Sequence, residues 1–273
     1  MNSSCGFCKV DSAELKSCAC KKVSYCGEDC QKADWKNHKP SCPLYIIREA
    51  PGKRLGVFAT RKIRNGEIIM EELPILLLRD GLSGNEFMTD HFPNISEETK
   101  SKIFKLRDPA DNIIALNSEQ YELWKSTNSA DLIWDLLSNC DDVSRILRIF
   151  RDNFFPICNG PEQGLYYEMS YINHGCIPNS WVKSDLQRKK VCALGTIEKD
   201  EEILINYRKG EGEEFNYGSR DYRRQRLLRT NGFLCQCFEC SLEGEALEDN
   251  ERMRAEVLRR WRDEERGDHR SID

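Results

Sequence analysis

The chain has 273 residues, of which 39% are hydrophobic and 32% charged, so it can bury a sizeable core beneath a polar surface. Its 41 Lys and Arg residues against 46 Asp and Glu give a net charge of −5, which disfavours a nucleic-acid-binding protein. No apolar run approaches the roughly 20 residues of a membrane helix, and the first residues lack a signal-peptide pattern. We therefore expect a protein of the nucleus or cytosol, whose 14 cysteines stay reduced and are available to metal ions.

The N-terminal segment carries eight side chains of the kinds that bind zinc. Each structural zinc ion takes four sulfur or nitrogen ligands, so this number predicts two tetrahedral sites. The segment has too little apolar content to fold alone, and metal binding must supply its folding free energy. The eight candidate ligands are Cys5, Cys8, Cys18, Cys20, Cys26, Cys30, His38 and Cys42.

The order of these ligands resembles that of a MYND finger, and the resemblance includes Gln31 and Trp35. It implies that the ligand pairs alternate between the two metals. Only Ala19 separates two of the ligands where the family commonly has two residues. We assign residues 1–43 to the finger and leave two roles open: a support for the next domain, or a docking module for proline-containing peptides. The implied ligand sets are Cys5, Cys8, Cys26 and Cys30 for one zinc ion, and Cys18, Cys20, His38 and Cys42 for the other.

Residues 44–230 form the predicted second domain. Its first two apolar runs, residues 57–59 and 68–72, are separated by an Asn-Gly pair, which predicts a two-stranded hairpin. Residues 73–78 predict another buried strand. From Ser96 onward to about residue 155, apolar residues recur at helical spacing behind a serine cap, which predicts helices.

Two later stretches carry the chemistry. Residues 171–180 contain an Asn-His pair, a cysteine and a Pro-Asn turn, and the glycine and proline interrupt both helix and strand. Residues 201–207 are strand-like and end at Tyr207. Together they resemble the Asn-His-x-Cys-x-Pro-Asn and Glu-Glu-x-x-x-x-Tyr signatures of the SET domain, the fold of protein lysine methyltransferases.

This resemblance implies a fold that is mainly β with a helical insert at about residues 80–165, an α+β fold. The Asn-His segment would thread beneath the strand that leads to Tyr207 and form a pseudoknot. Tyr207 would be catalytic, because its hydroxyl orients a neutral lysine amine toward the methyl group of S-adenosylmethionine. Residues 53–56 resemble the family's first glycine motif, with Arg54 in place of the middle glycine. The implied cofactor-binding residues are Lys53, Arg54, Leu55, Gly56, Asn173, His174, Tyr207 and Phe233.

The C-terminal part supplies three further thiols, one fewer than a tetrahedral site requires. The resemblance implies a post-SET zinc motif at residues 231–242 and a third zinc ion, with a fourth ligand from the Asn-His loop. Asn231 stands where relatives often have an aromatic residue, so the methylation state stays open. Residues 209–214 predict a mobile loop. Residues 243–273 predict a charged amphipathic helix with a narrow apolar stripe, Met253, Val257 and Trp261, in a tail that packs once and then frays. The four implied ligands of the third ion are Cys176, Cys235, Cys237 and Cys240.

We therefore expect a monomeric, S-adenosylmethionine-dependent methyltransferase that acts on a lysine of a protein or peptide, histone or non-histone. The alternative is a catalytically weak SET scaffold whose MYND finger recruits partners in transcriptional regulation. Arg54 and Asn231 favour the alternative, whereas the presence of Asn173, His174 and Tyr207 favours the enzyme.

Overall fold

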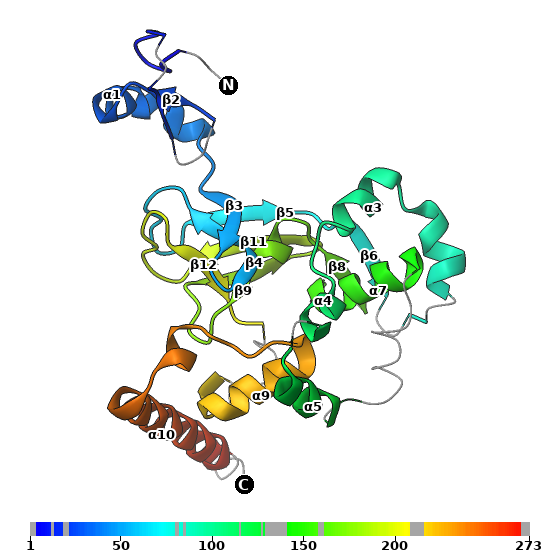
Figure 1. Cartoon of the computed structure of the whole chain (residues 1–273). Helices are drawn as coiled ribbons and strands as arrows, with labels where there is room; N and C mark the ends of the chain where they lie inside the picture. The colour runs from blue at the N-terminus through cyan, green and yellow to red at the C-terminus, as the bar shows by residue number, and fades with distance from the viewer. Residues whose placement is uncertain are drawn as a thin grey trace.

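The computed structural model shows a small N-terminal unit beside a β-rich body, with helices α9 and α10 at the opposite end (Figure 1). Within the described ranges, no helix combines the length and apolar character needed to span a membrane. The predicted ligand Cys20 and the predicted loop 209–214 lie outside those ranges. The structure describes residues 4–11, 14–18, 22–79, 82–83, 86–114, 116–126, 128, 141–157, 161–207 and 216–268.

The N-terminal unit is a two-stranded ribbon with one helix. Strands β1 (Lys16–Ser17) and β2 (Ser24–Tyr25) pair antiparallel, and α1 (Glu28–His38) runs into the 3-10 turn η1 (Lys39–Ser41). Its buried core consists largely of predicted metal ligands around the ring of Tyr25. Such a core is too small to hold the unit together without a metal ion.

The described residues of the body form three sheets. The first orders its strands β3-β4-β12-β9, the second β10-β11-β5 and the third β6-β8-β7. The main hydrophobic core joins the first two sheets through residues such as Val57, Met70 and Val191. The strands are β3 (Tyr45–Ala50), β4 (Lys53–Ala59), β5 (Ile68–Glu72), β6 (Leu76–Arg79), β7 (Phe154–Pro156), β8 (Glu162–Leu165), β9 (Asn173–His174), β10 (Ser180–Asp185), β11 (Arg188–Ala193) and β12 (Glu202–Ile205).

The predicted hairpin between residues 57–59 and 68–72 is wrong. β4 pairs with β3 and with β12, whereas β5 pairs with β11 in a different sheet. In the connection between β4 and β5, Ile63 forms an isolated antiparallel bridge with Ile197. The chain passes from one sheet to the other along this connection. The chain does turn at the Asn-Gly pair. However, β4 pairs with β12 and β5 pairs with β11, both more than a hundred residues away, instead of with each other.

The helical insert packs on the third sheet. Ser96 caps α3 by accepting the Thr99 N–H, as its sequence predicts. The expected helical region ends earlier than predicted, because residues 154–156 form β7 and pair with β8, so the insert also contains strands. The helices here are η2 (Phe87–His91), η3 (Phe92–Asn94), α3 (Glu97–Ile103), α4 (Pro109–Ile114), α5 (Ser118–Ser126) and α7 (Asp142–Asn153).

The Asn-His segment lies against β12. β9 pairs with it in parallel, with Leu204 opposite Asn173 and Ile205 opposite His174. The Asn179 side chain then accepts the Leu204 N–H at 2.8 Å and donates to the Glu202 carbonyl at 2.8 Å. These bonds hold the Pro-Asn turn against the strand that leads to Tyr207, in the threading expected for the pseudoknot.

Residues 216–268 contain α9 (Arg220–Asn231), the 3-10 turn η5 (Phe238–Ser241) and α10 (Gly244–Asp268). α9 ends at Gly232, whose φ of 69° turns the chain toward Phe233. The predicted C-terminal helix is present, but its apolar stripe does not pack closely: Met253 is 60% exposed and Val257 36%, and both line a cleft. A buried polar network around Arg254 anchors this helix instead.

Candidate active site and metal centres

A large cleft of about 1210 Å³ runs between the β-rich body, the ends of α7 and α9, and one face of α10. Five of the predicted cofactor-binding residues line it: Arg54, Leu55, Asn173, Tyr207 and Phe233. The other three, Lys53, Gly56 and His174, do not belong to the lining, although each is a direct neighbour in sequence of a residue that does. The cleft therefore collects side chains from stretches that are far apart in the sequence.

The first wall of the cleft is a polar network between β4, β9 and β12. Asn173 donates from Nδ2 to the Leu55 carbonyl at 2.8 Å and to a Glu202 carboxylate oxygen at 2.8 Å. The other Glu202 oxygen accepts from the Lys53 ammonium at 2.7 Å. Glu202 is thus a site residue that sequence reasoning left unassigned, although it belongs to the Glu-Glu signature. Its two oxygens fix the Asn173 amide and position β4.

A side chain at position 56 would displace the polar network formed by Glu202 and Asn173. A Cβ atom there would lie 2.7 Å from a Glu202 oxygen and 2.9 Å from the Asn173 amide nitrogen. Arg54, two residues earlier, has an exposed side chain that pairs with Asp111 of α4 at 2.9 Å. Its guanidinium therefore serves to link β4 to the insert, a role that the sequence left open.

Tyr207 lies at the junction of the body and the C-terminal part. Its hydroxyl donates to the Ile172 carbonyl at 2.8 Å, and its ring packs edge-on against Phe233 with 6.4 Å between centroids. Burial raises the pKa of the Tyr207 hydroxyl, although the nearby Arg107 guanidinium opposes this shift. The hydroxyl therefore stays protonated at neutral pH, and its oxygen lone pairs remain as acceptors.

His174 connects Tyr207 to the C-terminal thiols. Its Nδ1 lies 3.2 Å from the Tyr207 backbone nitrogen and its Nε2 lies 3.4 Å from the Cys176 sulfur. A backbone N–H can only donate, so Nδ1 is the acceptor and the proton of the neutral ring is on Nε2, directed at the sulfur. The side chain is buried, so any contact of this residue with a bound cofactor would come from its main chain.

Several cleft residues carry no motif and were missed by sequence reasoning. Arg107 lies 5.8 Å from the Phe233 ring centroid, and burial lowers its pKa. Asp152, near the end of α7, accepts from the Asn231 amide at 3.4 Å. These residues come from the segment before α4, from the end of α7 and from the end of α9, so tertiary structure brings them together and no local sequence pattern indicates it.

The C-terminal thiols form one compact cluster. The sulfur atoms of the four predicted ligands lie within 4.8 Å of one another, and those of Cys176 and Cys240 are 3.6 Å apart. Four sulfurs at about 2.3 Å from a tetrahedral zinc ion would be about 3.8 Å apart, so this donor set fits zinc. Leu227, Tyr207 and Phe233 pack against the cluster and exclude water from it.

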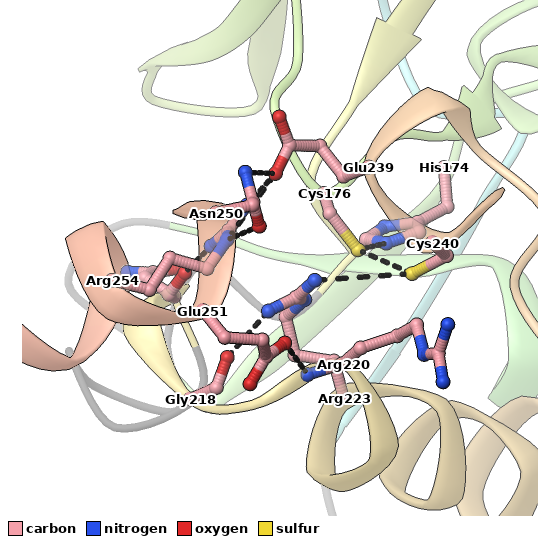
Figure 2. Close-up of polar contacts among 11 residues, drawn as sticks. His174, Cys176, Gly218, Arg220, Arg223, Glu239, Cys240, Asn250, Glu251 and Arg254 are labelled. Atoms are coloured by element: carbon pink, nitrogen blue, oxygen red, sulfur yellow. Dashed lines mark hydrogen bonds and ion pairs between the residues drawn. The ribbon is translucent and has the colours of Figure 1, made fainter. Parts of the chain in front are cut away.

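A buried guanidinium lies beside this cluster. Arg223 of α9 is fully buried, donates to the Gly218 carbonyl and directs Nη2 toward the Cys240 sulfur at 4.0 Å (Figure 2). The thiol cluster also raises the pKa of Arg223 against the opposing effect of burial. Four thiolates around a divalent ion carry two excess negative charges, which a buried cation partly neutralises.

The same close-up shows how α10 is attached (Figure 2). Arg254 donates to Glu239 at 2.8 Å in a buried ion pair, and Asn250 donates to the same carboxylate at 2.7 Å. Glu239 is the residue directly before Cys240, so the α10 anchor and the thiol cluster share one short segment.

The N-terminal unit contains two further clusters. The ligand atoms of Cys5, Cys8, Cys26 and Cys30 lie within 4.8 Å of one another, as do those of Cys18, His38 and Cys42. These are the alternating sets that the MYND resemblance implies, with Cys20 outside the described residues. The first set has four sulfurs, as a tetrahedral zinc site requires.

Two protein families match this chain, and its relatives include proteins named as lysine methyltransferases. The SET domain family matches residues 54–208, and the MYND finger family matches residues 5–42. The histone-lysine N-methyltransferase ASHR1 of Arabidopsis thaliana is 29% identical, over 83% of this chain and 44% of its own length. The N-lysine methyltransferase SMYD2-A of Xenopus laevis is 26% identical, over 87% of this chain and 50% of its own length. This chain spans about half the length of these curated relatives.

Among solved structures, the SET domain of LSMT bound to lysine and AdoHcy is 11% identical and aligns with a TM-score of 0.44 over 75% of this chain and 57% of that one.

The match to the SET domain family covers more than half of the 273 residues. The predictions of an α+β SET fold and of an N-terminal MYND finger are thus confirmed. The chain belongs to the SET domain family and carries a MYND finger ahead of its SET domain.

Proposed function

We propose that this protein is an S-adenosylmethionine-dependent protein lysine N-methyltransferase. Bound in the cleft, S-adenosylmethionine supplies an electrophilic methyl group on a sulfonium. Asn173, Leu55 and Phe233 would hold this cofactor, and Gly56 and Glu202 keep their wall of the cleft in place. The relatives named as lysine methyltransferases support the proposal, as does the presence of Leu55, Asn173 and Phe233 in the lining of one cleft.

The observation that carries the proposal is the Tyr207 hydroxyl. Because it donates its hydrogen to the Ile172 carbonyl at 2.8 Å, its oxygen is left to accept an N–H from a lysine amine. Accepting that hydrogen directs the nitrogen lone pair along one line, which is what an in-line methyl transfer needs.

The amine must be neutral to act as a nucleophile. The cationic Arg107 beside Phe233 disfavours a second positive charge in the same space, so it favours the deprotonated amine. No buried pair of carboxylates is needed for this chemistry, because binding and orientation do most of the work.

We also propose three zinc ions: two in the finger and one held by the C-terminal thiols. The last would fix both the Asn-His loop and the segment that carries Phe233. Docking of proline-containing peptides by the finger, a monomeric state and a nuclear or cytosolic location stay predictions.

The proposal is tested by two measurements on zinc-loaded protein. Calorimetric titration with S-adenosylhomocysteine should show micromolar binding that is lost in Asn173→Ala. Methyl transfer from labelled S-adenosylmethionine should fall at least ~100-fold in Tyr207→Phe while cofactor affinity stays within about twofold. Absence of cofactor binding in correctly metallated protein would contradict the enzyme and favour the scaffold alternative.

A further inference from the structure

His174 occupies a buried position where the β-rich body meets the C-terminal thiols. Its side chain is 4% exposed, and its ring centroid lies 5.4 Å from that of Tyr207 and 6.4 Å from that of Phe233. Asn173, directly before it, donates its amide to the Leu55 carbonyl in the wall of the cleft, whereas His174 does not belong to the lining. The two residues of the Asn-His pair therefore have different tasks, and contact with a cofactor does not account for the buried imidazole.

The imidazole extends the pairing between β9 and β12 by one hydrogen bond. These strands pair in parallel as far as His174 and Ile205, and the Gly175 N–H donates to the Ile205 carbonyl at 3.0 Å. The strand ends there, because bends follow at residues 176 and 177. Two residues beyond Ile205, the Tyr207 N–H donates to Nδ1 of His174 at 3.2 Å, so a side chain supplies the next acceptor. Because an N–H group without an acceptor is costly inside a protein, this bond fixes the backbone of Tyr207.

The other ring nitrogen faces the C-terminal thiols. Nε2 of His174 lies 3.4 Å from the Cys176 sulfur, in the contact drawn beside Cys240 in Figure 2. Since Nδ1 accepts a hydrogen bond, it carries no proton, and the proton of the ring is on Nε2. An N–H that donates to a metal-binding sulfur fixes the direction of that ligand. One rigid ring thus contacts a proposed zinc ligand with one nitrogen and the Tyr207 backbone with the other.

We propose that His174 is a positioning residue whose imidazole links the C-terminal metal site to Tyr207. Cys176, held by the metal, sets the orientation of the ring through Nε2, and the ring fixes the backbone from which the Tyr207 side chain extends. The Tyr207 hydroxyl is held at its far end by the Ile172 carbonyl at 2.8 Å, so both ends of this side chain are anchored. The imidazole acts on the reaction through Tyr207 without touching the substrate. The catalytic part of this inference rests on the methyltransferase function proposed above.

Two variants of similar shape separate the two bonds in the full, zinc-loaded chain. His174→Asn keeps an acceptor at the position of Nδ1 but does not reach the sulfur. His174→Gln keeps a donor near the position of Nε2 but offers no acceptor to the Tyr207 N–H. The matched control is His91→Gln, which changes a half-buried histidine of the helical insert outside the cleft lining.

Three measurements report on the two bonds. Exchange of the Tyr207 amide, followed by NMR with isotope-labelled tyrosine and assigned with Tyr207→Phe, should be at least ~10-fold faster in His174→Gln than in His174→Asn. The kcat of His174→Gln should lie at least ~10-fold below that of His174→Asn, while their affinities for S-adenosylhomocysteine agree within about threefold. Zinc release should show the opposite order, with the C-terminal ion passing to a chelator roughly tenfold faster in His174→Asn. His91→Gln should match the wild type in amide exchange and zinc release.

One measurement on the wild type does not depend on any variant folding. NMR of the imidazole nitrogens should find His174 with its proton on Nε2 and Nδ1 as an acceptor. A proton on Nδ1, equal Tyr207 exchange in the two variants, or equal zinc release would overturn the proposal. Failure of the wild type to bind S-adenosylhomocysteine would overturn the methyltransferase function instead, and the imidazole and exchange measurements would still decide the role of His174.

Discussion

The two cysteine-rich regions of this chain use the same ligand chemistry for different purposes. In the N-terminal finger, the ligands surround a small core of their own, and Cys8 and Cys26 are exposed. In the C-terminal cluster, the thiols pack against Tyr207 and Phe233, and Cys176 comes from the Asn-His loop itself. The finger's ligands therefore stabilise the finger, whereas the C-terminal thiols support Tyr207 and Phe233, which line the cleft, and contribute Cys176 to its lining. Ligand type alone does not distinguish these roles; the neighbours of the ligands do.

The largest effect is expected from removing one C-terminal ligand. Cys235→Ser should lose one metal ion and at least ~100-fold in affinity for S-adenosylhomocysteine, because the Asn-His loop and Phe233 lose their common anchor. The matched finger variant, Cys26→Ser, should also lose metal but keep cofactor affinity within about twofold. Metal content and calorimetric titration check both variants. Equal losses of affinity would remove the distinction between the two regions.

Glu239→Gln should have the next largest effect. It keeps the shape of the side chain but leaves the buried Arg254 guanidinium without its carboxylate, which should lower the free energy of unfolding by about 3 kcal/mol. Because Glu239 holds α10 through Arg254 and Asn250, we also expect faster proteolysis within α10. Urea unfolding and limited proteolysis test this. An unchanged proteolysis rate would show that α10 is held by other contacts.

Arg223→Met should weaken the C-terminal metal site without touching a ligand. Removing the buried cation leaves the negative charge of the thiolate cluster uncompensated, so zinc should pass to a chelator roughly tenfold faster. Arg229→Met, on the exposed side of the same helix, is the control. Release from the finger should be the same in all variants. If the C-terminal ion left Arg223→Met at the wild-type rate, the guanidinium would have no part in holding it.

The smallest effect is expected in the finger. Glu28 pairs with Lys32 one helical turn later, and both side chains are largely exposed, at 80% and 74%. Glu28→Gln should therefore leave thermal stability and metal content unchanged within error. A measurable loss of metal would mean that the finger depends on surface charge in a way that its geometry does not suggest.

Much of the site was predictable because its chemistry is local. The number and spacing of the ligands indicated the clusters around Cys5, whereas the resemblance to the SET domain supplied Cys176 as a fourth C-terminal ligand and marked Asn173, His174 and Tyr207 as site residues. The sequence alone did not indicate which residues far apart in the chain contact one another. The Glu202 to Asn173 bond, the approach of Asp152 to Asn231 and the choice of β12 as a partner for β4 each depend on packing. The wrong hairpin prediction has the same cause. The turn at the Asn-Gly pair is present, but the two strands beside it pair with distant strands.

The central claim is that the C-terminal metal centre, unlike the finger, holds the cleft together. Hydrogen–deuterium exchange of wild type, Cys235→Ser and Cys26→Ser tests it most directly. We predict that Cys235→Ser loses protection in residues 172–180 and 203–207 as well as around Phe233, while Cys26→Ser loses it only within residues 5–42. Wild-type protection of residues 172–180 and 203–207 in Cys235→Ser would contradict the claim.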